Sequence, residues 1–405
     1  MRAIGIVLAG GNSSRMGILA NKRAVAAMPI AGSYRSIDFA LSNMSNSHVQ
    51  KVAVCTQFNA RSLNQHLNSS KWWDFGRKQG GLFVLTPTMT TENNSWYRGT
   101  ADAMYQNIDF LRESHEPYVI ITSGDCVYKT DFNKMLEYHI NQKADITVGY
   151  TKLAAGQDDP TRFGVMQMDT DGRVLSFEEK PVVTDNMTVS TGIYIIRRRL
   201  LIGLLEKANA EQRYDFVKDI LVRYRETKKI YGYEMPGYWN NIATVDSYYR
   251  TNMDFLKKDV RDYFFGGYAS IYSKVEDQPP AKFNPGASVR NSLVASGCII
   301  NGKVENSVLF REVYVGNNCV IRNSIILNDV YIGDNTTIEN CIVESRGTIR
   351  ANETYSSLYR GSRFNWNFNG QGSFWIQPLV CSYSRICLIS SAYIFYSKIL
   401  YRNRF

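Results

Sequence analysis

Short apolar runs recur through the first 150 residues of the chain, and segments of mixed character separate them. The runs are residues 4–8, 52–56, 118–124 and 146–150. Continuous runs of this length are typical of strands buried on both faces of a parallel sheet. The segment that starts at Asp38 opens with an acidic residue suited to the start of a helix. This alternation predicts a Rossmann-like, doubly wound α/β domain over residues 1–255, with ligands beyond the carboxyl ends of the strands.

A second hydrophobic pattern with a longer period begins near residue 285. An aliphatic residue, a charged residue, Asn, a small residue and two aliphatic residues recur, and the last three copies are spaced by 17 residues. The copies begin at Val289, Val304, Ile321 and Ile338. A period near three hexapeptides per coil predicts a left-handed parallel β-helix over residues 285–356, with these aliphatic side chains stacked inside and Asn and Gly at the corners. Coils of this kind commonly drive oligomerisation.

A charged segment precedes the predicted β-helix, and an unusual tail follows it. Residues 256–284 include Pro279-Pro280 and have the composition of a linker. Residues 357–405 contain no Asp or Glu and are rich in Tyr, Ser and Phe, so we interpret them as non-native sequence or a poorly ordered extension. Arg385, Lys398 and interspersed serines interrupt the apolar stretch 379–400, and we expect no membrane span.

Charge and cysteine content bear on the partners and the cellular location of the protein. The net charge is +10, but residues 357–405 supply six of these charges and the rest of the chain has no dense Lys/Arg run, so we expect no nucleic-acid partner. The seven cysteines are odd in number and form no C-x-x-C, which favours thiols in a reducing cytoplasm. The amino-terminal residues lack the organisation of a signal peptide. We therefore expect a cytoplasmic protein.

A glycine-rich turn follows the first predicted strand. Gly10 and Gly11 let the backbone turn sharply and approach a ligand, and their N–H groups can cradle phosphate oxygens. Arg15 adds a planar set of donors for the same oxygens. The spacing matches neither the dinucleotide fingerprint nor the Walker motif, and an isolated turn of this kind is often only a connection.

Two further positions suit phosphate chemistry. Gly99-Thr100 enters a predicted helix, whose first N–H groups can bind an anion. Asp125 directly follows the strand at 118–124, where a carboxylate can hold Mg²⁺ between phosphates. Taken alone, the Gly-Thr pair also fits a simple helix cap, and an Asp after Gly is more often a turn residue.

The order of these motifs resembles the sugar-1-phosphate nucleotidyltransferases, and within them the bacterial glucose-1-phosphate adenylyltransferases. The resemblance rests on residues 10–16, 22–39, 96–103 and 237–248, and it covers about residues 1–355. It implies the synthesis of ADP-glucose and pyrophosphate from ATP and glucose 1-phosphate in bacterial glycogen synthesis. In that reaction the sugar phosphate attacks the α-phosphorus of ATP in line, with Mg²⁺ as the cofactor.

The resemblance also implies roles for single residues. Those of the nucleotide site are Gly10, Gly11, Arg15, Gly99 and Thr100. Those of the sugar-phosphate site are Glu179, Lys180, Ser190 and Gly192. Asp125 corresponds to the aspartate that holds Mg²⁺ in the family.

Several positions depart from the family pattern. Ser13 stands at the third glycine, and Val25-Ala26 replaces a Lys-Pro whose lysine contacts the phosphates during transfer. Asn241 stands at the second metal aspartate, so the Mg²⁺ site is weak or incomplete. Loss of one electrostatic donor typically costs on the order of 10²–10³ in rate, which predicts weak or no activity for this chain alone. The departures resemble the D-type subunit, a regulatory partner of a catalytic adenylyltransferase subunit in a heterotetramer.

Three other interpretations stay open from the sequence. The chain is an active nucleotidyltransferase if another lysine, such as Lys22, replaces the missing one. It is a non-catalytic sugar-nucleotide-binding protein if only binding survives. An acyltransferase is a third possibility because many contain a left-handed β-helix, but those enzymes generally use a His near the coils, and all four histidines lie upstream of residue 140.

Overall fold

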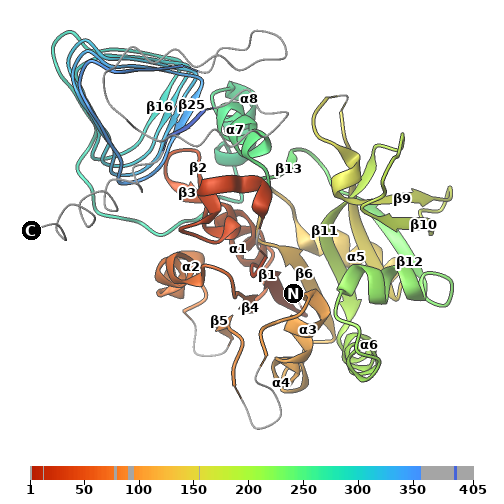
Figure 1. Ribbon diagram of the computed structural model, residues 1–405. Helices are drawn as coiled ribbons and strands as arrows, with labels where there is room; N and C mark the ends of the chain where they lie inside the picture. Colours follow the sequence, from red (N-terminus) through yellow and green to blue (C-terminus); the bar gives the residue numbers. More distant parts are fainter. Residues whose placement is uncertain are drawn as a thin grey trace, which may run out of the picture.

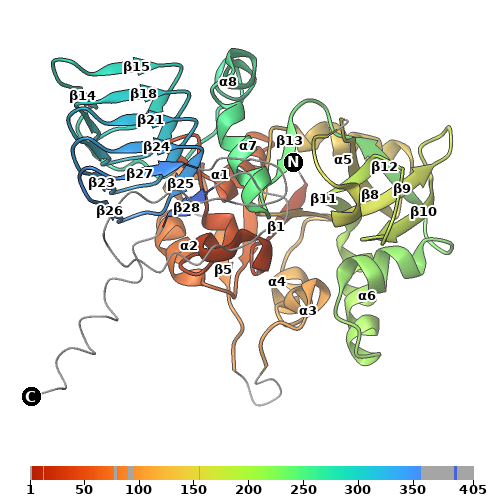
Figure 2. The same cartoon turned by 45° about the horizontal axis from the view of Figure 1, so that its top comes forward.

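The computed structural model describes residues 2–11, 13–76, 80–89, 95–154, 156–356 and 387–389. An α/β domain built from the chain up to Asn241 lies beside a three-sided β-helix, which is the teal-to-blue prism in Figure 1. Helices α7 (Val245–Asp254) and α8 (Lys258–Phe265) lie between the two bodies in both views (Figures 1 and 2).

A nine-stranded mixed sheet forms the centre of the α/β domain. Its strands are β1 (Ala3–Leu8), β4 (Lys51–Cys55), β5 (Gly81–Leu85), β6 (Tyr118–Ser123), β8 (Ile146–Lys152), β9 (Gly164–Met168), β10 (Val174–Glu179), β11 (Thr188–Arg197) and β12 (Ile230–Glu234). They follow the order β10-β9-β11-β6-β1-β4-β5, and β8 joins β11 to β12. Strands β6, β1, β4 and β5 are parallel, whereas β11 is antiparallel to its neighbours. The four predicted apolar runs form β1, β4, β6 and β8, which confirms the predicted fold class.

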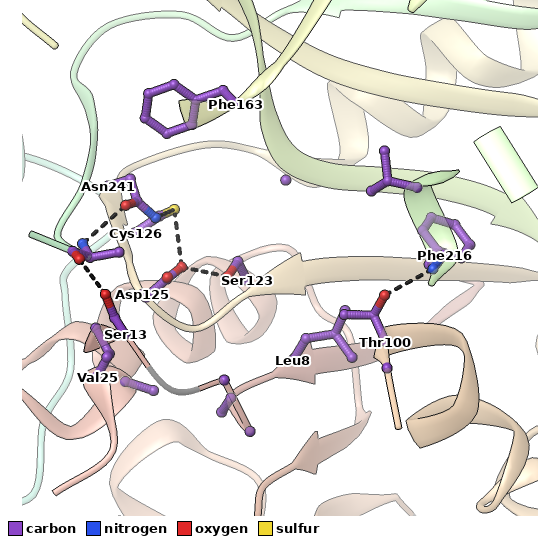
Figure 3. Close-up of a pocket in the computed structure, with 18 of the residues that line it drawn as sticks. Leu8, Ser13, Val25, Thr100, Ser123, Asp125, Cys126, Phe163, Phe216 and Asn241 are labelled. Atoms are coloured by element: carbon purple, nitrogen blue, oxygen red, sulfur yellow. Dashed lines mark hydrogen bonds between the residues drawn. The ribbon is translucent and has the colours of Figure 1, made fainter. Parts of the chain in front are cut away.

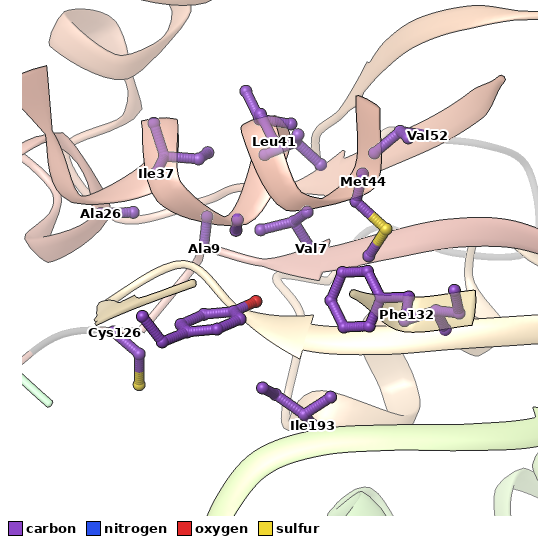
Figure 4. Close-up of a cluster of buried hydrophobic side chains, with 14 of the residues drawn as sticks. Val7, Ala9, Ala26, Ile37, Leu41, Met44, Val52, Cys126, Phe132 and Ile193 are labelled. Carbon is purple, nitrogen blue, oxygen red and sulfur yellow. The ribbon is translucent and has the colours of Figure 1, made fainter. Parts of the chain in front are cut away.

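Helices cover both faces of this sheet. They are α1 (Ser36–Asn46), α2 (Ala60–Leu67), α3 (Thr100–Tyr105), α4 (Ile108–Arg112), α5 (Phe132–Asn141) and α6 (Arg198–Ala210). Figure 4 shows α1 against the sheet, where Ile37, Leu41 and Met44 pack on Val7 and Val52, all of them fully buried. Residues from α3, α4 and α6 form a second core on the opposite face. Burial on both faces explains why the strand sequences are continuously apolar.

Short strands and irregular helical turns complete the α/β domain. The short strands are β2 (Pro29–Ile30), β3 (Tyr34–Arg35), β7 (Cys126–Tyr128) and β13 (Trp239–Asn241). The turns are the 3₁₀ segments η1 (Ser14–Ala20), η2 (Val25–Ala27), η3 (Ser70–Trp73) and η4 (Pro160–Arg162) and the π-helical η5 (Val217–Val222). Strands β7 and β13 pair antiparallel beside the main sheet.

Three five-stranded parallel sheets form the faces of the β-helix. The first contains β14 (Lys282–Phe283), β17 (Ile299–Ile300), β20 (Tyr314–Val315), β23 (Tyr331–Ile332) and β26 (Thr348–Ile349). The second contains β15 (Ser288–Arg290), β18 (Lys303–Glu305), β21 (Val320–Arg322), β24 (Thr337–Glu339) and β27 (Thr354–Ser356). The third contains β16 (Leu293–Val294), β19 (Val308–Leu309), β22 (Ile325–Ile326), β25 (Cys341–Val343) and β28 (Cys387–Ile389).

The repeat explains the geometry of each coil. The residues that begin the four copies stack in register on neighbouring strands of the second sheet. The Asn of each copy, at positions 291, 306, 323 and 340, has a positive φ between 40° and 54°. Asn tolerates this left-handed conformation better than most residues, so it suits the corners of the coil.

A third hydrophobic core joins the two domains. It includes Phe39 of α1, Phe255 and Phe264 from the α7–α8 region, and Phe310 and Leu327 from the β-helix, each at most 1% exposed. A buried ion pair adds a polar link, since Arg23 Nη2 lies 2.5 Å from Glu344 Oε1. The predicted linker 256–284 contains α8 and β14, and part of it therefore packs into this core.

Most of the predicted tail lies outside the described residues. Of residues 357–405, the structure describes Cys387–Ile389, and this strand pairs parallel with β25. Among the helices that the structure describes, none combines the length and the apolar character that crossing a bilayer requires.

Candidate functional site

A cavity of about 750 Å³ opens at the carboxyl ends of β1, β4 and β6. Leu8, Cys55 and Ser123, the last residues of these strands, belong to its wall. All twelve sequence-predicted site residues also line it, namely Gly10, Gly11, Arg15, Val25, Gly99, Thr100, Asp125, Glu179, Lys180, Ser190, Gly192 and Asn241. Figure 3 shows part of this wall. The alternative lysine, Lys22, is exposed and is not among the residues that line the cavity.

The glycine loop is tied to a distant segment by Ser13. Its hydroxyl donates a hydrogen bond to the carbonyl of Ala243 at 2.6 Å. The N–H of Ala243 in turn donates to Oδ1 of Asn241 at 3.0 Å (Figure 3). The residue at the third-glycine position therefore connects the nucleotide loop to the predicted metal position, a contact across 230 residues that the sequence did not indicate.

Two N–H groups in the first turn of α3 are already paired within the protein. The carbonyl of Tyr214 accepts hydrogen bonds from Ala101 at 2.8 Å and Asp102 at 3.3 Å. Thr100 Oγ1 accepts from the N–H of Phe216 at 2.9 Å. A Cβ on Gly99 would lie 2.3 Å from the Tyr214 carbonyl oxygen, so the glycine permits this close backbone approach.

The predicted lysine position forms an apolar part of the wall. The Val25 side chain lines the cavity but is only 6% exposed, because it also packs in the interdomain core with Met16 and Leu19. Ala26 is buried beside Gly124, since a Cβ added to Gly124 would lie 3.1 Å from the Cβ of Ala26. Val25 and Ala26 therefore offer no charge to a phosphate in the cavity.

The pairing of β7 with β13 places Asn241 directly opposite Cys126, next to Asp125. Asp125 Oδ1 accepts hydrogen bonds from Ser123 Oγ at 2.5 Å and from Cys126 Sγ at 3.6 Å. Asn241 Nδ2 donates to Cys126 Sγ at 3.5 Å (Figure 3). Burial, and after it the negative charge of Asp125, raises the pKa of the Cys126 thiol well above its ordinary value, so this cysteine is a neutral donor rather than a nucleophile.

As ligands, the side chains of Asp125 and Asn241 fit Mg²⁺ poorly. Mg²⁺ favours carboxylate oxygens together with substrate phosphates, and here Asp125 is accompanied by the amide of Asn241. The Asn241 oxygen already accepts from the Ala243 N–H and, at 3.3 Å, from Nη2 of Arg162. Within the described part of the chain, no three His, Cys, Asp or Glu side chains gather closely enough to hold a metal ion.

The sugar-phosphate residues lie at another part of the cavity wall. Lys180 has a φ of 52°, an unusual conformation for a residue with a side chain. Its N–H donates to the Phe163 carbonyl at 3.0 Å, and its Nζ lies 3.1 Å from Oε1 of Glu179. The Lys180 side chain is more than half exposed. Strained residues of this kind cluster at ligand sites, so Lys180 keeps its candidate role.

Arg162 is the main site residue that the sequence missed. Its Nη1 donates to both carboxylate oxygens of Asp158, at 2.5 and 2.6 Å, and its side chain is 10% exposed. The residue lines the cavity beside Asn241, 79 positions away in the sequence. No local sequence pattern marks such a long-range contact.

Comparisons with known proteins identify relatives over most of the chain. A family model described as nucleotidyl transferase matches residues 4–258, and one described as GlmU-like, C-terminal hexapeptide matches residues 279–355. A glucose-1-phosphate adenylyltransferase of Clostridium perfringens is 38% identical over 322 residues, which cover 79% of this chain and 81% of the relative. One of Bacillus subtilis is 40% identical over 323 residues, which cover 79% and 84%.

Proposed function

The chain belongs to the nucleotidyl transferase family, among the glucose-1-phosphate adenylyltransferases, and from this premise we propose that it binds the ligands of ADP-glucose synthesis while contributing little chemistry of its own. The reaction joins ATP and glucose 1-phosphate to give ADP-glucose and pyrophosphate. The observation that carries this proposal is the wall of the cavity, which brings the candidate binding residues together with the uncharged Val25 and Asn241.

The chemistry explains why these two positions matter. Negative charge develops on the transferring phosphate in the transition state, and catalysis depends on fixed positive charge that meets it. Arg15 is the candidate partner of the nucleotide phosphates, and Lys180 is the candidate partner of the sugar phosphate. Val25 places methyl groups where the family lysine would place an ammonium group, so the bound substrates would be held without being activated.

We further propose that the chain acts in the cytoplasm as a regulatory subunit beside a catalytic adenylyltransferase subunit, in a heterotetramer. Two features support this role. The candidate binding residues line the cavity together with Val25 and Asn241, which stand where the family has charged residues. The β-helix supplies regular faces on which a second subunit can pack. Ligand binding here would then alter the catalytic subunit through the contact between them.

A paired activity assay tests the proposal. The chain alone should release little or no pyrophosphate from ATP and glucose 1-phosphate, and a catalytic subunit should change its rate or its substrate affinity when this chain is added. An unrelated β-helix protein serves as the control. Full turnover by the chain alone would instead support an active enzyme, and substrate binding without any effect on a catalytic subunit would support a separate sugar-nucleotide-binding protein.

A further inference from the structure

The Arg162 guanidinium stands beside the position where the family places its second metal aspartate. Its Nη2 lies 3.3 Å from Asn241 Oδ1, and Asn241 in turn contacts Cys126 next to Asp125. A fixed positive charge is therefore part of the protein at this point.

The side chain of Asp158 holds Arg162 in a buried ion pair. Asp158 is 6% exposed and is not among the residues that line the cavity, whereas Arg162 is. Nε of Arg162 is buried and has no hydrogen-bond partner within the part of the chain that the structure describes. Because Nε is enclosed by protein, a ligand in the cavity can reach only the Nη end of the guanidinium, where Nη2 donates one of its two N–H groups to Asn241.

The balance of charge around the cavity favours an anion. Four cationic side chains line it against two carboxylates, namely Arg15, Arg98, Arg162 and Lys180 against Asp125 and Glu179. Arg98, Arg162 and Lys180 each pair with a carboxylate, that of Asp102, Asp158 and Glu179 respectively, and Asp102 and Asp158 do not themselves line the cavity. A sugar phosphate carries about two negative charges near neutral pH, and this set of cations can match that charge.

We propose that Arg162 supplies the positive charge of the predicted metal position, so that the cavity binds a sugar phosphate or a nucleoside diphosphate sugar without a divalent ion. The inference rests on the proposed function and adds to it the charge state of the ligand. A metal-chelated triphosphate would bring its cation against the Arg162 guanidinium, where like charges repel. The cavity therefore selects metal-free ligands.

Calorimetry on the full chain tests this inference. ADP-glucose and glucose 1-phosphate are each titrated in excess EDTA and again in millimolar MgCl₂. We expect Kd values that agree within about threefold between the two buffers. Arg162→Gln should weaken binding about tenfold or more in both buffers, because charge-assisted hydrogen bonds to the phosphate are lost. Arg173→Gln removes an exposed arginine of the same domain and should leave Kd unchanged.

Two further variants keep the test decisive. Arg162→Lys preserves the charge but not the planar guanidinium, and it should weaken binding less than Arg162→Gln does. If Arg162→Gln does not fold, Arg162→Lys takes its place in the test. Asn241→Asp adds a carboxylate beside Asp125, and its binding should become tighter with MgCl₂.

The outcomes separate the inference from the proposed function. Binding of the parent chain that is at least tenfold tighter with MgCl₂, or unchanged binding in both folded Arg162 variants, would overturn the inference and leave the proposed function in place. An absence of heat with both ligands in both buffers, from folded protein, would overturn the two together.

Discussion

At the scale of single residues, the chemistry of the cavity depends on what Val25 and Asn241 replace. Val25 is packed among apolar neighbours, so its side chain stabilises the fold rather than a phosphate. Asn241 retains hydrogen bonds to Cys126 and Ala243 but brings no negative charge. Both side chains fit their surroundings well, which indicates a site adapted to its present residues.

Restoring the two charged groups tests this interpretation directly. Val25→Lys with Asn241→Asp should raise pyrophosphate release, with ATP, glucose 1-phosphate and Mg²⁺, at least about tenfold over the parent. The stem of the new lysine can follow the apolar wall while its ammonium group reaches the cavity. Each single change should help less than the pair, because both groups act on the same developing charge. A third change, Ala26→Pro, fixes the backbone that presents the lysine.

The parent chain is the control for this gain. Turnover by the parent at about 1–10³ per second would contradict the non-catalytic interpretation outright. If the variant with Val25→Lys and Asn241→Asp binds both substrates and stays inert, other departures from the family pattern cause the loss of activity. Ser13 is the first of these to change, because it ties the glycine loop to Ala243.

Lys180 gives a second prediction at this scale. Lys180→Ala should weaken the binding of glucose 1-phosphate about tenfold, since a charged hydrogen bond to the phosphate is lost. The left-handed backbone at φ 52° is equally costly for both residues, so stability should change little. Isothermal titration measures the affinity, and Lys152→Ala, at an exposed lysine of the same domain, is the control. Equal affinities in the three proteins would remove Lys180 from the site.

At the scale of elements, the sequence predicted what depends on local pattern. The runs that form β1, β4, β6 and β8 are apolar because both faces of the sheet are covered, and the 17-residue repeat follows from the coil. The sequence could not show that Tyr214 occupies the start of α3, because that partner lies more than 100 residues away. Arg162 escaped notice for the same reason. The predicted site residues lie at one cavity, and only the family resemblance allowed us to predict this.

Helix α5 and strand β8 give a pH-dependent prediction. His139 is buried between them, with Nδ1 2.8 Å from Thr147 Oγ1 and its ring edge-on to Tyr118. Burial, assisted by the charge of Arg197 and opposed by that of Asp145, lowers the pKa of His139 to about 4. The unfolded chain, with an ordinary pKa near 6.5, therefore binds the proton more tightly, and stability falls as the pH drops from 6.5 towards 4.

The expected size of this effect is about 2 kcal/mol between pH 7 and pH 5. Urea unfolding of the parent and of His139→Gln at both pH values measures it, because the variant lacks this titration and should lose correspondingly less stability. His115→Gln, at an exposed histidine, should behave like the parent. Parallel losses in the parent and in His139→Gln would show that the histidine is not held neutral by its surroundings.

At the scale of the whole molecule, the interdomain core makes the two domains one packed unit. Aromatic side chains from α1, α7, α8 and the β-helix share a single cluster, and the Arg23–Glu344 ion pair lies beside the same junction. Deletion of residues 285–350 would uncover Phe39, Phe255 and Phe264. A truncated chain is therefore a poor probe of subunit assembly, and substitutions that leave this core intact are required.

Phe310 allows the coupling between the domains to be measured. The side chain is 1% exposed and extends from the β-helix into the shared core, so Phe310→Ala should cost about 3–5 kcal/mol of unfolding free energy. Because the cavity it leaves is bordered by both domains, the unfolding of each should shift together. Urea titration followed by tryptophan fluorescence, whose six sources include the buried Trp73 and Trp239 of the α/β domain, and by far-ultraviolet circular dichroism, which includes the β-helix, should give coincident midpoints. Phe283→Ala, at a β-helix phenylalanine that is 53% exposed, is the matched control and should change the midpoint little. Separate transitions, with only the circular dichroism signal shifted, would show that the β-helix unfolds alone and that the shared core does not couple the domains.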